Sequence, residues 1–217
     1  METVSDYREL DSLTRPLKVL LWLGAAIALG SLFSSVMVLN ELNAPGYRPS
    51  TEPNASDLRE GAVGITHLVI YLITVVIFAR WIIRAHKNLP ALGSDRGNIT
   101  PGWAVGYFFV PFLNLWKPFE AMRELWNISG DPRDPNISKT PGLLGIWWGL
   151  WVVSNYLGQA MMRTSMTQQS LEGEKSNAML GVADGFLSIL LCIAAAQVVS
   201  EITQRQQNIR DQRPRAQ

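Results

Sequence analysis

The sequence predicts an all-α membrane protein with four transmembrane helices, a short broken hydrophobic hairpin at about 101–116 and an amphipathic interfacial helix at about 117–129. Three observations predict this class: long runs without charge, a one-sided distribution of Lys and Arg, and an apolar stretch interrupted by proline. Apolar and aromatic residues make up 47% of the 217 residues, and eight are Trp. This composition is unusual for a soluble domain of this size.

Four segments are apolar over the thickness of a bilayer. They cover 19–39, 61–79, 140–162 and 176–200, and Asp184 is the one charged residue within them. A helix that rises about 1.5 Å per residue needs roughly 20 such residues to cross about 30 Å of hydrocarbon, whereas apolar runs in buried soluble helices rarely exceed about 14. We expect one integral membrane domain over 1–217, with a polar N-terminal arm at 1–16, a polar C-terminal tail at 203–217 and transmembrane helices at 19–39, 61–83, 140–162 and 176–200.

The first apolar segment follows an acid-bearing arm and is longer than the apolar part of a signal peptide, so we expect it to stay as a helix. The single cysteine, Cys192, lies inside the last span. It cannot form an intramolecular disulfide, and its position indicates a packing role.

The segment from Pro101 to Trp126, PGWAVGYFFVPFLNLWKPFEAMRELW, decides the topology. If its apolar part spans the membrane, the Lys and Arg residues divide nine inside against ten outside; if it does not, four crossings place fifteen inside against four outside. Positive charge concentrates in cytoplasmic loops, which favours four crossings of the membrane with both termini cytoplasmic. Because Pro111 removes a backbone donor and irregular backbone at membrane depth needs cover, we expect a buried or interfacial hairpin.

Tryptophan placement agrees with this threading. Indole side chains favour the headgroup level of a membrane. Seven Trp residues fall at or near the cytoplasmic headgroups, namely Trp22, Trp81, Trp103, Trp116, Trp126, Trp147 and Trp148.

After Pro118 the pattern becomes that of a surface helix. Phe119, Met122 and Trp126 recur at steps of three and four residues and form an apolar stripe. This pattern predicts a helix that lies on the inner membrane surface.

A cluster of charges is expected beside this helix. The end of the second span places three bases on one face, and the surface helix carries two acids. The bases would pair with the acids or, as the alternative, contact anionic lipid headgroups. This candidate cytoplasmic ion-pair cluster consists of Arg80, Arg84, Lys87, Glu120 and Glu124.

Two motifs carry a family resemblance. RWIIRAHKNLPALG and, after a short gap, PGWAVGYFFVPFLNLWKPFEAMRELW resemble the signature of the bacterial multi-pass membrane family called domain of unknown function 4328, over roughly Ala79 to Trp126. The resemblance implies a bacterial membrane protein without an established activity. It assigns no catalytic residue.

Polar residues at membrane depth are functional hypotheses by default. His67 near the outer end of the second span, Asn155 in the outer third of the following predicted span and Asp184 in the outer third of the last fall at similar depth. They would form a polar pocket open to the outer leaflet. Such a pocket suits a small ligand or a proton, but a structural clasp of hydrogen bonds between helices is the simpler interpretation.

The usual catalytic and metal-binding arrangements are missing from the sequence. It has no metal-ligand spacing, P-loop or dinucleotide glycine motif, and its two histidines, His67 and His86, are about 28 Å apart along one helix. We expect no enzymatic activity, no metal and no cofactor. Three GxxxG patterns allow close helix approach, within the chain or in a homo-oligomer: Gly102/Gly106, Gly145/Gly149 and Gly181/Gly185.

These features favour a non-enzymatic membrane scaffold or regulator with a cytoplasmic-side interaction surface. Its expected partners are the lipid bilayer and a protein partner or a second copy, with no nucleic acid. The alternative is a small transporter, channel or ligand-binding membrane protein that uses the outer polar pocket.

Overall fold

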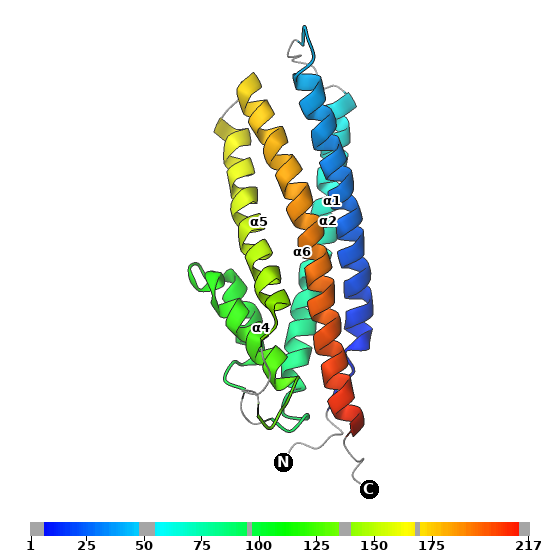
Figure 1. The fold of residues 1–217 in the computed structure, drawn as a ribbon, viewed down its shortest axis with the longest axis vertical. Coiled ribbons are helices and arrows are strands. Elements are labelled where there is room, and N and C mark those ends of the chain that lie inside the picture. Colours follow the sequence, from blue (N-terminus) through cyan, green and yellow to red (C-terminus); the bar gives the residue numbers. More distant parts are fainter. Residues whose placement is uncertain (1–6, 48–54, 95–96, 135–139, 168–169, 213–217) are drawn as a thin grey trace. The chain divides into compact units, whose positions relative to one another are not determined.

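The computed structural model describes residues 7–47, 55–94, 97–134, 140–167 and 170–212. This part of the chain is helical and contains no strand (Figure 1). Its α-helices are α1 (Asp11–Leu42), α2 (Ala55–Lys87), α3 (Pro101–Gly106), α4 (Lys117–Ile128), α5 (Gly142–Thr167) and α6 (Leu171–Gln212). Two 3-10 turns, η2 (Tyr107–Phe109) and η3 (Leu113–Leu115), lie between α3 and α4.

Three of the helices are long and apolar enough to cross a membrane: α1, the Gly61–Lys87 part of α2, and α6. The predicted span at 140–162 forms α5, which has 26 residues but is not among the three helices that qualify. Its one charged residue is Arg163, and uncharged polar residues such as Asn155 and Gln159 interrupt its apolar sequence. The fourth span therefore stays a prediction.

The helices extend beyond the predicted spans at both ends of the chain. Helix α1 begins at Asp11, inside the predicted polar arm, and contains Pro16. A proline inside a helix costs about 3 kcal/mol. Leu10, Leu13 and Leu17 are buried here, and each fully buried leucine contributes about 1.5–3 kcal/mol, so packing outweighs the proline.

The predicted C-terminal tail is also partly helical. Helix α6 continues through 203–212, because Ile202, Thr203 and Gln206 are buried and hold this part against the protein. Residues 213–217 of the predicted tail lie outside the described residues.

The chain forms two compact units, and each long helix contributes to both. Unit 1 takes its described residues from 1–19, 74–148 and 194–217, and unit 2 takes them from 20–73 and 149–193.

Unit 1 has a dense aromatic and aliphatic core. Phe78 stacks on Trp81 with ring centroids 5.9 Å apart and meets the edge of Trp147 at 6.2 Å. On α4 the apolar face is buried as well, with Met122 fully covered and Trp126 3% exposed. The sequence predicted the amphipathic pattern of α4, but here its apolar face is covered by protein and does not require a lipid surface.

The tryptophans of unit 1 divide into two groups. Trp81, Trp126, Trp147 and Trp148 are buried in the core, whereas Trp103 and Trp116 are exposed on the segment before α4. The expected belt of indoles at a membrane surface therefore reduces, in this unit, to the exposed pair.

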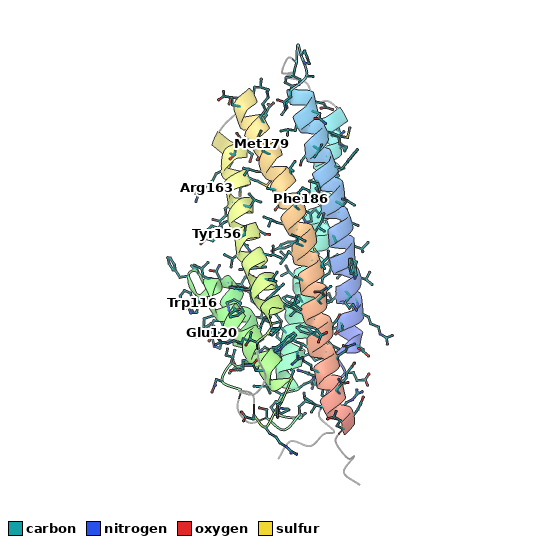
Figure 2. All side chains as sticks on the ribbon, in the orientation of Figure 1. Trp116, Glu120, Tyr156, Arg163, Met179 and Phe186 are labelled. Atoms are coloured by element: carbon teal, nitrogen blue, oxygen red, sulfur yellow. The ribbon has the colours of Figure 1, made fainter. Side chains whose placement is uncertain are left out.

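Unit 2 exposes many large apolar side chains. Ile65 on α2, Tyr156 on α5, and Met179 and Phe186 on α6 are all more than half exposed (Figure 2). A water-soluble protein rarely presents such contiguous apolar surface. These helix faces suit contact with a lipid bilayer.

Two glycines bring α1 and α6 together inside unit 2. A Cβ atom at Gly185 would lie 2.7 Å from Leu32 Cβ, and one at Gly181 would meet Ser35. The Gly181/Gly185 pattern therefore packs within the chain. By contrast, a Cβ at Gly145 or Gly149 would meet no described atom within 4 Å.

Candidate functional site

The N-terminal arm is held to the end of α2 by one asparagine side chain. Asn88 Oδ1 accepts a hydrogen bond from the Arg8 backbone N–H at 3.0 Å, and Asn88 Nδ2 donates to the Arg8 carbonyl at 2.9 Å. The side-chain amide thus pairs with a peptide group in the way that one strand pairs with another. Asn88 is 1% exposed whereas Arg8 is exposed, so both bonds are partly buried.

A second amide extends this contact to α6 and α4. Gln206 Oε1 accepts from Asn88 Nδ2 at 3.2 Å, and its Nε2 donates to the Ala85 carbonyl at 3.0 Å and to the Ser129 hydroxyl at 3.1 Å. Gln206 is fully buried. We call Arg8, Asn88, Gln206 and Ser129 the amide relay. It joins four separate segments, and a buried polar network with every bond satisfied fixes one arrangement of those segments.

A hydroxyl pair adds a second polar contact in the same unit. Thr14 on α1 and Thr203 on α6 are hydrogen bonded at 2.8 Å, and Trp81 Nε1 donates to Thr14 Oγ1 at 3.0 Å. All three side chains are buried. The start of α1 is therefore fixed by hydrogen bonds as well as by its leucines.

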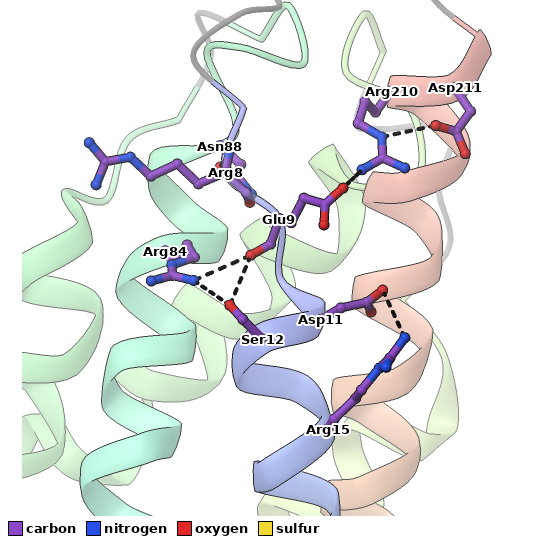
Figure 3. Close-up of polar contacts among 9 residues, drawn as sticks. All are labelled: Arg8, Glu9, Asp11, Ser12, Arg15, Arg84, Asn88, Arg210 and Asp211. Atoms are coloured by element: carbon purple, nitrogen blue, oxygen red, sulfur yellow. Dashed lines mark hydrogen bonds and ion pairs between the residues drawn. The ribbon is translucent and has the colours of Figure 1, made fainter.

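Charged side chains surround the arm (Figure 3). Arg210 is 2.9 Å from a Glu9 carboxylate oxygen and 2.9 Å from Asp211. Arg84 donates to the Ser12 hydroxyl at 2.8 Å and to the Glu9 carbonyl at 3.3 Å. We call Glu9, Arg84, Arg210 and Asp211 the charged rim. Because both acids pair with Arg210 and Arg84 is held by hydrogen bonds, while the side chains reach solvent, the rim can present a fixed pattern of charge.

Tyr7 lies beside the charged rim. The Arg210 guanidinium is 5.4 Å from the centre of its ring. Burial raises the pKa of the Tyr7 phenol to about 12, against a smaller opposing effect of Arg210, and the hydroxyl has no hydrogen-bond partner in the described structure. The ring therefore acts here as an apolar anchor for the arm.

The residues of the predicted ion-pair cluster have other partners. Glu120 pairs with Lys117 at 2.7 Å, and this bond raises the pKa of the lysine. The Glu124 carboxylate accepts hydrogen bonds from the backbone N–H groups of Asn98 and Ile99, with N to O distances of 3.1 Å in both cases.

On the α2 side, Arg84 bonds to the arm, and Arg80 and Lys87 are exposed. Within the described residues, no ion pair joins these bases to Glu120 or Glu124. The spacing predicts which residues share a face of each helix, but Arg84, Glu120 and Glu124 bind nearer partners.

The predicted polar pocket draws its three residues from three helices of unit 2. His67 lies on α2, Asn155 on α5 and Asp184 on α6, and no hydrogen bond or ion pair among the described residues joins them. Asn155 is exposed and donates to the Trp151 carbonyl of its own helix at 2.8 Å. The pocket therefore stays a prediction.

Sequence reasoning missed Asn88 and Gln206. A signal for Gln206 was present, since Val198, Val199 and Ile202 form a buried stripe that reaches Gln206 four residues later. A polar residue that continues an apolar stripe predicts a buried hydrogen bond. No comparable pattern marks Asn88. Among the described residues, no group of His, Cys, Asp and Glu could hold a metal ion.

The helices and their exposed apolar faces define the class of protein: an all-helical protein with three helices suited to crossing a membrane. The family described as "Domain of unknown function (DUF4328)" matches residues 49–204, well over half of the sequence, and the chain belongs to this family. Neither a curated protein nor a solved structure matches it.

Proposed function

We propose that this protein is a non-enzymatic scaffold or regulator in a bacterial cytoplasmic membrane. It would cross the bilayer four times as a single domain, with both termini and unit 1 on the cytoplasmic side. Unit 1 would offer the interaction surface, and a protein partner would bind the charged rim and the polar face of α4. The excess of Lys and Arg on that side supports this orientation.

The amide relay is the observation that carries the proposal. Its hydrogen bonds hold the N-terminal arm in place and thereby fix the positions of Glu9 and Arg210. A surface whose side chains are held before binding loses less conformational entropy when a partner docks. This property suits recognition, whereas no nucleophile and base converge among the described residues.

The topology is tested by labelling with an impermeant thiol reagent. In a Cys192→Ser background, single cysteines replace Asn54, Asn136 and Gln207, and intact cells are labelled from outside. Labelling at Asn54 alone supports the proposed threading. Labelling at Asn136 as well would reject it.

The interaction surface is tested by site-specific photo-crosslinking in cells. A photoreactive residue replaces Arg123, which is exposed on α4, and a control replaces Ile65, which is exposed on an apolar face. We expect a discrete protein adduct from Arg123 only. The double exchange Glu9→Arg with Arg210→Glu keeps the ion pair but reverses its direction, so it should remove the adduct while leaving the fold intact. An adduct that still forms after the exchange would show that the partner does not recognise the charged rim.

The polar residues His67, Asn155 and Asp184 at predicted membrane depth favour a second candidate, a small transporter, channel or ligand-binding protein. Purified protein in vesicles is assayed for proton or cation flux, with Asp184→Asn as the variant and Asn155→Ala as the matched control. Flux that is lost only with Asp184→Asn would place this function ahead of the scaffold. Absence of flux in the wild type would remove it.

A further inference from the structure

The hairpin before α4 holds the most exposed aromatic side chains of unit 1. Phe112 is 78% exposed and Phe109 is 71% exposed, and Trp116 follows in the same segment. The apolar face of α4, which directly follows, is buried in the same unit. The apolar surface that unit 1 leaves uncovered is therefore concentrated in the hairpin and not on the amphipathic helix.

The tip of this hairpin is a strained turn. Phe112 has φ of 66° and ψ of −48°, and the Leu113 N–H donates to the Pro111 carbonyl at 2.9 Å. These values describe a γ-turn of the rare kind, which is unfavourable for a residue with a bulky side chain. A glycine would adopt this backbone without cost. Strain of this kind, at a residue whose side chain has no cover, is a sign of function.

The hairpin lies beside the apolar ends of the long helices. Trp148 Nε1 donates to the Leu115 carbonyl at 3.2 Å, and the ring of Phe108 meets Trp148 edge-on at 6.2 Å. The neighbouring Trp147 packs on Phe78, which is one residue from the end of the charge-free stretch of α2. The hairpin is thus at the level where α2 changes from apolar to basic.

The surface around the hairpin is apolar, as is a helix face that contacts lipid. Val76 on α2 and Ile146 on α5, both in unit 1, are also more than half exposed. No charged residue occurs from Val110 to Trp116, and the first one after it, Lys117, is neutralised by Glu120. The position of the hairpin at the end of the apolar helices gives this charge-free, aromatic surface the character of one that contacts acyl chains near the headgroups.

We propose that Phe109 and Phe112 insert among the acyl chains of the inner leaflet, so that the hairpin is a lipid-binding loop. The inference rests on the membrane placement given under the proposed function. The strained turn at Phe112 aims an aromatic ring away from the protein, and the lipid covers it. The hairpin then holds the start of α4, and with it unit 1, at the membrane surface.

The test measures where the tip lies in lipid nanodiscs. In a Cys192→Ser background, an NBD fluorophore is attached to Phe112→Cys, to Ile65→Cys as the lipid-exposed control and to Arg133→Cys as the water-exposed control. Quenching is measured with nitroxides on lipid acyl chains, close to the headgroup or close to the chain end, and with iodide in water. We expect the Phe112 probe to be quenched most by the shallow nitroxide and several-fold less by iodide than the Arg133 probe.

Each other outcome rejects the inference in a recognisable way. Strong iodide quenching at Phe112 would place the tip in water, and quenching by neither agent would show that protein or a second copy covers it. If the Ile65 probe also escapes the lipid nitroxides, the membrane placement itself fails. A probe at Phe109→Cys, with and without Phe112→Gly, gives an independent check. If the Phe112 ring holds the hairpin in the lipid, iodide should quench the Phe109 probe several-fold more in the Phe112→Gly variant, and equal quenching would contradict the inference.

Discussion

The contact of α1 with α6 in unit 2 can be tested by adding one methyl group. Gly185 lies where α6 passes α1, and Gly149 lies on an uncovered face of α5. Replacing each by Ala adds the same methyl group to the same kind of helix. The two variants therefore differ in surroundings and not in chemistry.

The expected cost follows from the atoms that the new Cβ would meet. At Gly185 these are Leu32 Cβ at 2.7 Å, Leu32 Cα at 3.1 Å and the Ala28 carbonyl oxygen at 3.3 Å. Two of the three are backbone atoms, so no rotation of a side chain removes the clash. Overpacking of this kind costs about 1–3 kcal/mol. Alanine stabilises a helix by about 0.5–1 kcal/mol relative to glycine, which is less than the cost of the clash, so the variant should be destabilised.

At Gly149 the same helix gain has no opposing clash, because the added methyl group meets nothing within 4 Å. The variants are compared as purified protein in detergent, with the thermal midpoint followed by tryptophan fluorescence. A change of 1 kcal/mol shifts the midpoint by roughly 2–4 °C in a chain of this size. We expect Gly185→Ala to fall several degrees below wild type and Gly149→Ala to equal or exceed it.

Equal midpoints for the two alanine variants would refute the close approach of α1 and α6. Size-exclusion chromatography of the same samples gives a second reading. If Gly149→Ala dissociates an oligomer, the uncovered α5 pattern serves an association between copies, which would add a partner to the proposed scaffold.

Three further predictions concern unit 1. Gln206→Leu removes the hydrogen-bond partner of the Ala85 carbonyl and of the Ser129 hydroxyl. The free energy of unfolding should therefore fall by about 1–3 kcal/mol per buried group, and an unchanged thermal midpoint would contradict the amide relay. The folded pKa of Tyr7 is about 12 against an ordinary value of 10.0, so the unfolded state loses the proton first; stability should fall between these pH values, and Tyr7→Phe should lose less in alkaline unfolding curves. Phe112→Gly removes the positive-φ strain and should unfold at or above the wild-type temperature; a clear decrease would show that the ring is needed for packing.

The existence of the long helices could be predicted from the sequence, but their ends could not. Runs without charge identify a membrane-crossing segment because the cost of a charge in hydrocarbon is large. They say nothing about where a helix ends once it leaves the bilayer. Helix α6 continues to Gln212 because Ile202 and Gln206 find cover on other segments, and that cover is a property of the tertiary structure.

The partners of individual charges were also beyond the sequence. Periodicity predicts which side chains share a helix face, but it does not predict which other segment faces them. Arg84 meets an N-terminal arm that is distant in sequence, and Glu124 meets backbone N–H groups that no residue type marks. A surface ion pair contributes only about 0–1 kcal/mol, so such charges follow the packing of the helices and do not direct it.

The same limit explains the most informative difference, which concerns α4 and the hairpin. An amphipathic pattern shows that a helix has an apolar face, but it does not show whether protein or lipid covers that face. Here protein covers Met122 and Trp126, while Phe109 and Phe112 are left exposed by a segment too short for any periodicity. Because the apolar face of α4 is already occupied, its outer polar face is free to meet water or a partner. The proposed membrane contact and the proposed interaction surface of unit 1 thus involve different residues, and variants of the hairpin and of the charged rim can separate them.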